Sequence, residues 1–228
     1  MHVLITAAHP DDVDFSCGGT VRSLANGGAA ITLVVATSGD AGVPDGAEGA
    51  SLREREQEAA AKILGIEAVR FLRLPDGDVE PTRQLRRRLT SAIRLCRPGL
   101  VITHTPTRNL RSVRSSHRDH LAVGQATLEA VYPDARNGLA HPRLLEQGLA
   151  PHTVPEVWLH GTDTPDFTVD ITTTFDSKMR AVNCHASQKA AVGDSPEEFF
   201  REWGAGVAAR HGLPRGRLAE EFMRLDTR

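Results

Sequence analysis

Short apolar runs that alternate with helical patterns limit the folds open to this chain more than any other feature. Four such runs are rich in β-branched residues and have the length of buried strands; they cover 2–8, 30–38, 68–74 and 99–105. Helix-favouring segments lie between them, at 18–28, 52–65 and 82–97. Strands separated by single helices build right-handed crossovers in a parallel sheet. We therefore predict an α/β fold.

The second half of the chain continues this pattern. We expect a helix over 118–131 and strands over 156–161 and 166–172, the last of which alternates and suits an antiparallel position. From Thr174 onward the sequence predicts helices with two breaks. These breaks lie near Gly193 and at Gly212–Pro214. The whole pattern predicts a Rossmann-like, mostly parallel sheet flanked by helices.

Composition narrows the classes of partner. The 228 residues are 40% hydrophobic and 25% charged, with a net charge of −2, so bulk charge favours neither nucleic acid nor an anionic membrane. Three scattered cysteines without a CxxC motif indicate no disulfide framework and no thiolate zinc site. The start, MHVLITAAHPDD, is unlike a signal peptide, and no apolar run is long enough for a membrane helix. We expect one cytoplasmic domain over 1–228, with no prediction of its oligomeric state.

Polar residues follow each of the first four predicted strands at the point where the strand ends. They are His9-Pro10-Asp11-Asp12, Ser38-Gly39-Asp40, Pro75-Asp76-Gly77 and His104. Because open parallel sheets bind ligands beyond the carboxyl ends of their strands, we place the active site there. The adjacent carboxylates of Asp11 and Asp12 repel each other, which a bound cation would relieve. The alternative is an acidic turn that caps a helix.

A second motif, HRDH, stands at the start of the helix after the fourth strand. It contains His117, Asp119 and His120, and the alternative is again a set of polar capping residues. Imidazole with carboxylate and no thiolate suits zinc, while iron(II) or cobalt would suit the same ligands. A hydrolytic zinc site has three protein ligands and an open position. The candidates are His9, one of Asp11 and Asp12, and one of His117 and His120, while Asp119 is close enough to orient an imidazole.

These motifs resemble those of the LmbE-like, or PIG-L, zinc-dependent de-N-acetylases. The family pattern A-H-P-D-D matches Ala8 to Asp12, and H-P-D-H matches His117 to His120. Weaker matches are LREREQEAAAKILG (52–65), LPDG (74–77), HASQ (185–188) and AEEF (219–222), so the resemblance covers nearly the whole chain. It implies a metal-dependent hydrolase that releases acetate and a free amine from an N-acetylglucosamine-type glycoside or a related amide.

The resemblance also implies roles for individual residues. The implied ligands of one zinc ion are His9, Asp12 and His120. Asp11 would be the general base, and protonated His117, tuned by Asp119, would stabilise the oxyanion. The implied substrate contacts are Arg53, Asp76, Arg118 and His185. Arg118 replaces the usual proline, and Asp14 replaces a usual glutamate, where it would support the site from behind.

Several residues have simpler interpretations. In the simpler interpretation, Arg53 pairs with Glu56 on a solvated helix face. Asp76 would then be only a turn residue, and His104 would have a structural role. Four arginines crowd the second motif and predict an anionic group on the substrate, unless they form only a solvated loop. They are Arg108, Arg111, Arg114 and Arg118.

Three other functions compete with de-N-acetylation. A dinucleotide-binding domain would need a G-x-G-x-x-G turn where this chain has HPDD. A magnesium-dependent phosphotransfer domain would not need the histidines. A metal-binding protein without activity is the third alternative.

Overall fold

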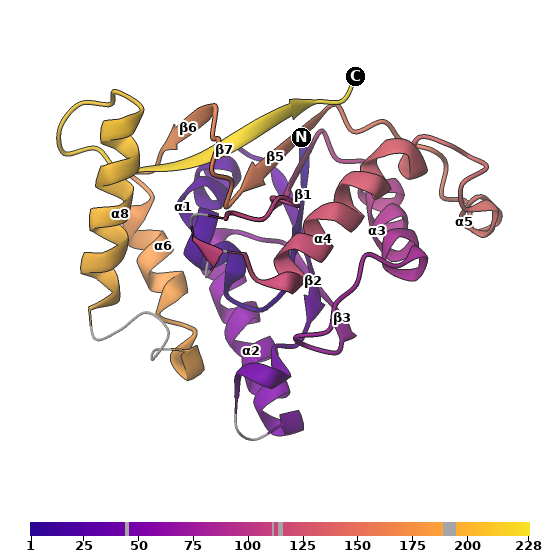
Figure 1. Ribbon diagram of the computed structural model, residues 1–228, viewed down its shortest axis with the longest axis horizontal. Coiled ribbons are helices and arrows are strands. Elements are labelled where there is room, and N and C mark those ends of the chain that lie inside the picture. Colours follow the sequence, from indigo (N-terminus) through magenta and orange to yellow (C-terminus); the bar gives the residue numbers. More distant parts are fainter. Residues whose placement is uncertain (44–45, 111, 114–115, 189–194) are drawn as a thin grey trace.

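The computed structural model describes residues 1–43, 46–110, 112–113, 116–188 and 195–228. Seven strands form one sheet in the order β3-β2-β1-β4-β5-β7-β6 (Figure 1). They are β1 (His2–Ala7), β2 (Ala30–Thr37), β3 (Ala68–Leu74), β4 (Leu100–His104), β5 (Glu156–His160), β6 (Phe167–Asp170) and β7 (Ala219–Asp226). The first five strands run parallel to one another, whereas β7 runs antiparallel to both β5 and β6. The predicted α/β class is confirmed.

Helices cover both faces of the sheet (Figure 1). They are α1 (Asp12–Asn26), α2 (Gly46–Leu64), α3 (Arg83–Cys96), α4 (Arg118–Glu129), α5 (Pro142–Glu146), α6 (Phe175–Val182) and α8 (Pro196–Arg210). Helices α1, α2 and α6 pack together, and α3 packs with α4. Short helical turns are η1 (Asp40–Gly42), η3 (Ala130–Ala135) and η4 (Ala186–Gln188). None of the described helices is long and apolar enough to cross a membrane.

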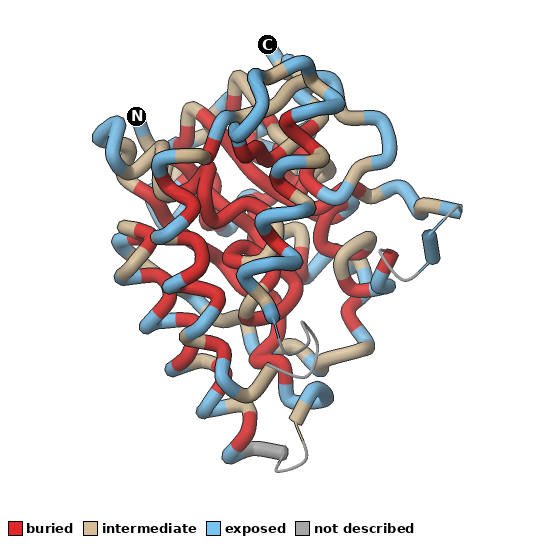
Figure 2. The backbone as a smooth tube through the Cα atoms, turned by 90° about the vertical axis from the view of Figure 1, so that its left-hand side faces the viewer, coloured by how far each residue is buried: buried red, intermediate tan, exposed pale blue. Residues whose placement is uncertain are grey.

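Two apolar layers hold the helices against the sheet. Along β1, Val3 and Ile5 join the layer under α1 and α2, while Leu4 joins the layer under α3 and α4. This alternation follows from the pleat, which sends successive side chains to opposite faces. Since both faces are covered, β1, β2 and β4 are buried along nearly their whole length, within the buried interior of the molecule (Figure 2). The site must therefore lie at the ends of the strands.

The first helix begins earlier than predicted. It starts at Asp12 and not at Gly18, so the HPDD motif leads directly into its first turn. The glycine pair looked like a helix start, but it serves packing: a Cβ on Gly19 would lie 2.7 Å from the Cβ of Ile171. Glycine therefore lets α1 approach the segment after β6 closely.

The end of the chain differs from the predicted run of helices. Residues Ala219–Asp226 form β7, between β5 and β6. Pairing on both sides outweighs the helix preference of its alanine and glutamates. Glu220 is fully buried, accepts from the N–H groups of Gly19 and Thr20, and pairs with Lys178 at 2.6 Å. The predicted break at Gly212 is confirmed, whereas Gly193 lies outside the described residues.

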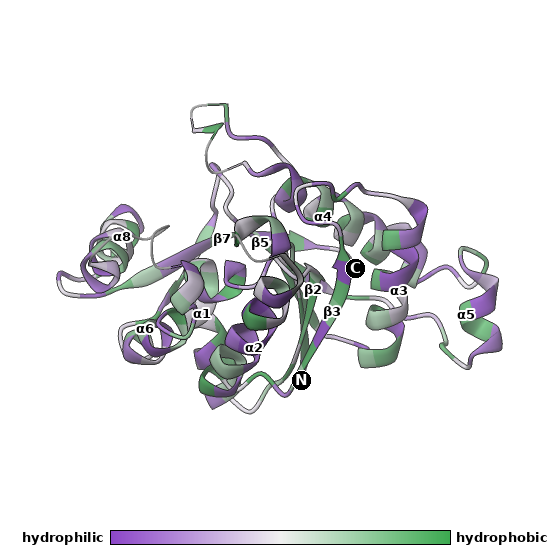
Figure 3. Ribbon diagram, turned by 90° about the horizontal axis from the view of Figure 1, so that it is seen from below, coloured by the Kyte–Doolittle hydropathy of each residue, from purple (hydrophilic) through white to green (hydrophobic). Residues whose placement is uncertain are grey.

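Helix α8 stands at the opposite end of the molecule from α5 (Figures 1 and 3). It carries apolar and polar residues side by side along its length (Figure 3). Phe200, Val207 and Ala208 are buried against β6 and β7, whereas Phe199 keeps 56% of its surface exposed. Helix α8 therefore lies beyond the last strand of the sheet, near the carboxyl ends of β4 and β5.

Candidate metal centre and active site

The turn after β1 places two adjacent carboxylates in different surroundings. Asp11 adopts a left-handed backbone with φ of 95°, a conformation that is costly outside glycine. Its N–H donates to Oε1 of Gln57 at 2.9 Å, and Arg53 donates to the carbonyl of Pro10 at 2.7 Å. Helix α2 thus fixes the turn, and Asp12 begins α1.

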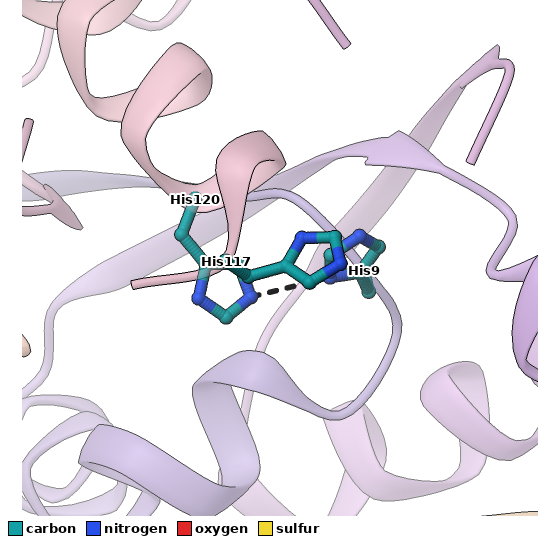
Figure 4. Close-up of side chains that lie close together, drawn as sticks. All are labelled: His9, His117 and His120. Carbon is teal, nitrogen blue, oxygen red and sulfur yellow. Dashed lines mark hydrogen bonds between the residues drawn. The ribbon is translucent and has the colours of Figure 1, made fainter. Parts of the chain in front are cut away.

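Three side chains from the two sequence motifs meet at the carboxyl end of the sheet. Nδ1 of His9 lies 3.2 Å from Nε2 of His120, the contact drawn as a dashed line in Figure 4. Nε2 of His120 lies 3.0 Å from Oδ1 of Asp12, and Nδ1 of His9 lies 3.7 Å from Oδ2 of Asp12. Ligands about 2.0–2.1 Å from a tetrahedral ion are about 3.3 Å apart. This donor set fits one zinc-class ion.

The carboxylate of Asp12 is oriented by its hydrogen bonds. Its Oδ2 accepts from the N–H groups of Ala8 and His9, at 3.0 and 2.8 Å, and lies 3.1 Å from Nε2 of His104. Oδ1 is therefore left to face His120. Burial alone would raise the pKa of Asp12, but His120, His104 and His9 hold that pKa well below its usual value. The carboxylate stays ionised, as a metal ligand must.

His9 is held from its other ring nitrogen by two carboxylates. Nε2 lies 3.1 Å from Oδ1 of Asp76 and 3.2 Å from Oδ2 of Asp119. Burial lowers the pKa of His9, but Asp12, Asp119 and Asp76 outweigh it and raise the pKa to about 12. Surroundings that stabilise a proton so strongly also stabilise a metal cation. A carboxylate on the far nitrogen is how metal-binding imidazoles are usually oriented.

Two predicted roles change with this geometry. We predicted that Asp119 tunes His117, but its carboxylate contacts His9 and accepts from the N–H groups of Gly77 and Val79, at 2.8 and 3.2 Å. Asp76, expected to face the substrate, contacts His9 as well. Both carboxylates reach the same imidazole because the turn after β3 and the start of α4 converge on it.

Asp11 lies beside the proposed ligands and pairs with Arg53. Its Oδ2 is 2.9 Å from a terminal nitrogen of Arg53, whose side chain is 5% exposed. Burial and the charge of Asp12 raise the pKa of Asp11 to about 7, against the opposing effect of Arg53. A carboxylate in this range suits a general base. Arg53 therefore does not form the solvated pair with Glu56 that we weighed; Glu56 accepts from Ser187 instead.

His117 lies next to the proposed ligands, with its ring 4.8 Å from that of His9 (Figure 4). Burial lowers its pKa, as do the neighbouring His9 and His120. The N–H of Asp119 donates to Nδ1 of His117 at 3.3 Å, so the proton of the neutral ring belongs on Nε2. We expected a protonated imidazole here; the surroundings favour a neutral ring that still has one N–H to donate.

Asp14 and His185 form a buried pair behind Asp11. Nε2 of His185 is 3.0 Å from Oδ2 of Asp14, and both side chains are fully buried. Oδ2 of Asp14 also accepts from Gln57 at 2.8 Å, so the pair is linked to the turn at Asp11. His185 was expected to contact substrate, but its side chain is fully buried and contacts Asp14. The supporting role of Asp14 stays a prediction.

The arginine loop is only partly described. Arg118 is exposed and pairs with Asp78 at 3.4 Å, and Arg108 donates to the carbonyl of Ser116 at 3.4 Å. Both line a shallow hollow beside Leu121. Arg111 and Arg114 lie outside the described residues.

Sequence reasoning missed one side of the site. His104 and His160 end the paired strands β4 and β5, and they line a cavity of about 330 Å³ next to Asp12 and His120. We call this cavity the apolar pocket. Its other walls come from α1, α4 and α8: Phe15, Ser16, Leu121, Phe199, Phe200 and Trp203, with Thr105 and Gly161 at strand ends. The rule that strand ends carry the chemistry pointed to His104, but nothing local identified α8.

A Rossmann-like sheet that brings together two imidazoles and one carboxylate, with a second carboxylate beside them, is typical of a metal-dependent hydrolase. The family model "PIG-L: GlcNAc-PI de-N-acetylase" matches residues 4–131, more than half of the chain. The chain belongs to this family, as its motifs predicted.

Relatives and solved structures agree with this assignment. A diacetylchitobiose deacetylase of Thermococcus kodakarensis is 31% identical over 205 residues, covering 88% of this chain and 73% of the relative. A 1D-myo-inositol 2-acetamido-2-deoxy-alpha-D-glucopyranoside deacetylase of Rhodococcus erythropolis is 29% identical, covering 86% and 84%. The structure of N,N'-diacetylchitobiose deacetylase from Pyrococcus horikoshii superposes with a TM-score of 0.87 at 28% identity, covering 99% of this chain and 84% of that one.

Proposed function

We propose that this protein hydrolyses the amide of an N-acetylglucosamine-type glycoside or a related amide, releasing acetate and a free amine. One observation carries the proposal: the imidazoles of His9 and His120 approach each other to 3.2 Å, and each lies within 3.7 Å of a carboxylate oxygen of Asp12, the neighbour of Asp11. Membership of a family of de-N-acetylases supports the same reaction.

We propose zinc as the ion, held by His9, Asp12 and His120. Two imidazoles and a carboxylate without thiolate are typical zinc ligands in hydrolases, and iron(II) or cobalt would suit them too. When bound, such an ion lowers the pKa of water and polarises a carbonyl. Asp76 and Asp119 keep His9 turned so that Nδ1 faces the other donors.

Residues around the ion then divide the proton transfers. Asp11 takes a proton from the attacking water, and Arg53 holds its carboxylate in place. The Nε2–H of neutral His117 donates to the oxygen of the tetrahedral intermediate. An N–H placed in this way is worth about 3–4 kcal/mol in the transition state. The leaving nitrogen takes up the proton that Asp11 removed from the water, while neutral His117 keeps its Nε2–H.

We also propose that the substrate carries an anionic group beyond the sugar. Arg108 and Arg118 line one hollow, which shares Leu121 with the apolar pocket. Guanidinium groups there would bind a carboxylate or a phosphate by paired hydrogen bonds. The variant Arg118→Ala should raise KM for an anionic N-acetylglucosaminide and leave KM for a neutral one unchanged; equal effects on both substrates would remove this proposal.

The test of the function combines metal analysis with product detection. Purified full-length protein should contain about one zinc-class ion per chain and release acetate from N-acetylglucosamine conjugates. A chelator should abolish the release, and added zinc should restore it. Activity that requires magnesium and a phosphoryl donor would favour the phosphotransfer alternative. Bound metal without turnover on a panel of neutral and anionic conjugates would favour a protein without activity.

A further inference from the structure

The metal centre opens on one side into the apolar pocket, which the proposed mechanism does not use. Of the groups assigned to the centre, Asp12 and His120 line this pocket, whereas Asp11, Arg53 and His117 do not. A substrate group that occupies the pocket therefore lies next to the metal ligands Asp12 and His120 and extends away from Asp11. The atom nearest to them in the reaction is the carbonyl carbon of the amide.

Aromatic rings form the far wall of the pocket. The ring of Phe15 lies 5.7 Å from that of Phe200, and Phe199 lies 5.2 Å from Phe200. Lys178 supports this wall, with Nζ 5.1 Å from the ring centres of both Phe200 and Trp203. Nζ is itself fixed by the carbonyl of Phe15 at 2.8 Å and by its buried ion pair. The wall is therefore preformed.

The polar groups of the pocket do not suit a charged ligand. None of the described lining residues is lysine or arginine. His160 is buried, and its Nε2 has no hydrogen-bond partner among the residues that the structure describes. Burial, followed by the neighbouring His104, lowers the pKa of His160 well below its usual value, so the ring is neutral. A neutral lining with several aromatic rings favours an apolar group.

The size of the pocket exceeds what an acetyl group needs. A methyl group is about the size of a water molecule, which takes about 30 Å³ in the liquid, so it would fill roughly a tenth of the 330 Å³. The aglycone of a glycoside is separated from the amide by the sugar ring, whereas the acyl chain begins at the carbonyl carbon itself. The acyl chain is therefore the part of the substrate that reaches the pocket from the metal ligands.

We propose that the apolar pocket is an acyl subsite, and that this protein hydrolyses N-acyl amino sugars with apolar acyl groups longer than acetyl. The inference rests on the proposed function and specifies its substrate. Water adds to the carbonyl, the carbon–nitrogen bond breaks, and a carboxylate and a free amino sugar leave.

The experiment compares N-acetyl-, N-butanoyl-, N-hexanoyl- and N-octanoylglucosamine with the zinc-loaded, full-length protein, following release of the amine. Burial of each added methylene should raise kcat/KM about fourfold until the pocket is filled. Phe199→Ala removes an exposed part of the wall and should lower the octanoyl-to-acetyl ratio of kcat/KM about tenfold. Glu198→Ala changes the exposed neighbour, which does not line the pocket, and should leave the ratio unchanged.

The outcomes separate the subsite from the function. If kcat/KM is flat or falls with chain length while acetyl is still released, the acyl subsite is wrong and the deacetylase function stands. If no substrate in the series yields amine, including the acetyl compound, the function itself fails. A parallel series of N-acetylglucosaminides with alkyl aglycones tests the other occupant. A chain-length gain there, lost in Phe199→Ala, would give the pocket to the aglycone and overturn the acyl assignment.

Discussion

The two sides of the metal centre differ in how their side chains are held. Toward α2, Asp11 is bonded through its carboxylate to Arg53 and through its backbone N–H to Gln57, and the hydrogen bonds continue from Gln57 to Asp14 and His185. We call this the base side. Toward α8, the apolar pocket is formed by aromatic rings and by His160, whose Nε2 has no hydrogen-bond partner within the described part of the chain. Hydrogen bonds fix the position and angle of each side chain on the base side. The apolar pocket limits the shape of a ligand but makes few directional contacts with it.

This difference separates the reaction from the choice of substrate. Hydrogen bonds fix the angle as well as the distance of a carboxylate, which proton transfer requires. Aromatic rings accept apolar groups of several shapes, because dispersion and desolvation have no strong direction. Changes on the base side should therefore remove activity for all substrates. Changes in the apolar pocket should alter which substrates are used.

Removal of a ligand shared by both sides should have the largest effect. His120→Ala takes away one of the three proposed metal donors, so the purified variant should lose its ion, and activity should fall by more than about 1,000-fold. Metal content by mass spectrometry and acetate release check this result. His211→Ala, a histidine distant from the centre that pairs with Glu221, is the matched control. Full metal occupancy in His120→Ala would remove His120 from the ligand set.

The base side should lose turnover without losing metal. Asp11→Asn keeps the size of the side chain but cannot take a proton, so kcat should fall by about 100- to 10,000-fold with metal content unchanged. Asp12→Asn should instead weaken metal binding. Asp40→Asn, an exposed aspartate after β2, provides the control. If Asp11→Asn and Asp12→Asn behaved alike in both assays, the separate roles of the two carboxylates would have no support.

The carboxylates behind His9 should affect metal affinity by a smaller factor. Asp119→Asn leaves a neutral group beside Nε2 of His9, and such changes weaken metal binding by about 10- to 100-fold. Asp76→Asn should act in the same direction, since it contacts the same nitrogen. Competition with a chelator measures both affinities. A changed kcat at unchanged zinc affinity would show that Asp119 acts on His117, as the sequence motif had suggested.

The smallest expected effect concerns stability on the side of the apolar pocket. Because the pKa of His160 is lowered in the folded state, unfolding takes up a proton below the unfolded value of about 6.5. Its contribution to stability is thus complete above about pH 6.5 and is lost as pH falls, by about 1.4 kcal/mol per unit. His160→Gln should flatten the decline of unfolding free energy between pH 7 and 5.5, measured in urea with chelator present. Parallel curves for the variant and the wild-type protein would contradict this.

The strands and the sheet edge follow from local patterns in the sequence. The starts of β1 to β5 lie within one residue of the predicted runs, because buried parallel strands read as continuous apolar segments. Parallel strands end at one edge of a sheet, and ligands bind beyond that edge. This rule alone predicts that HPDD and HRDH lie close together. A single domain over 1–228, the ion and a cytoplasmic location stay predictions.

Tertiary packing decided what no local pattern contains. The partner of Asp119 is His9, 110 positions away, and His104 orients Asp12 across 92 positions. The tail at Ala219–Asp226 became a strand because two neighbours offered it hydrogen bonds, against its own helix preference. Helix α8 lies at the site because strand β7, which follows it in the chain, pairs at that end of the sheet. Local sequence sets the period and the ends of each element, but the free energy of contacts between distant elements selects which side chains meet.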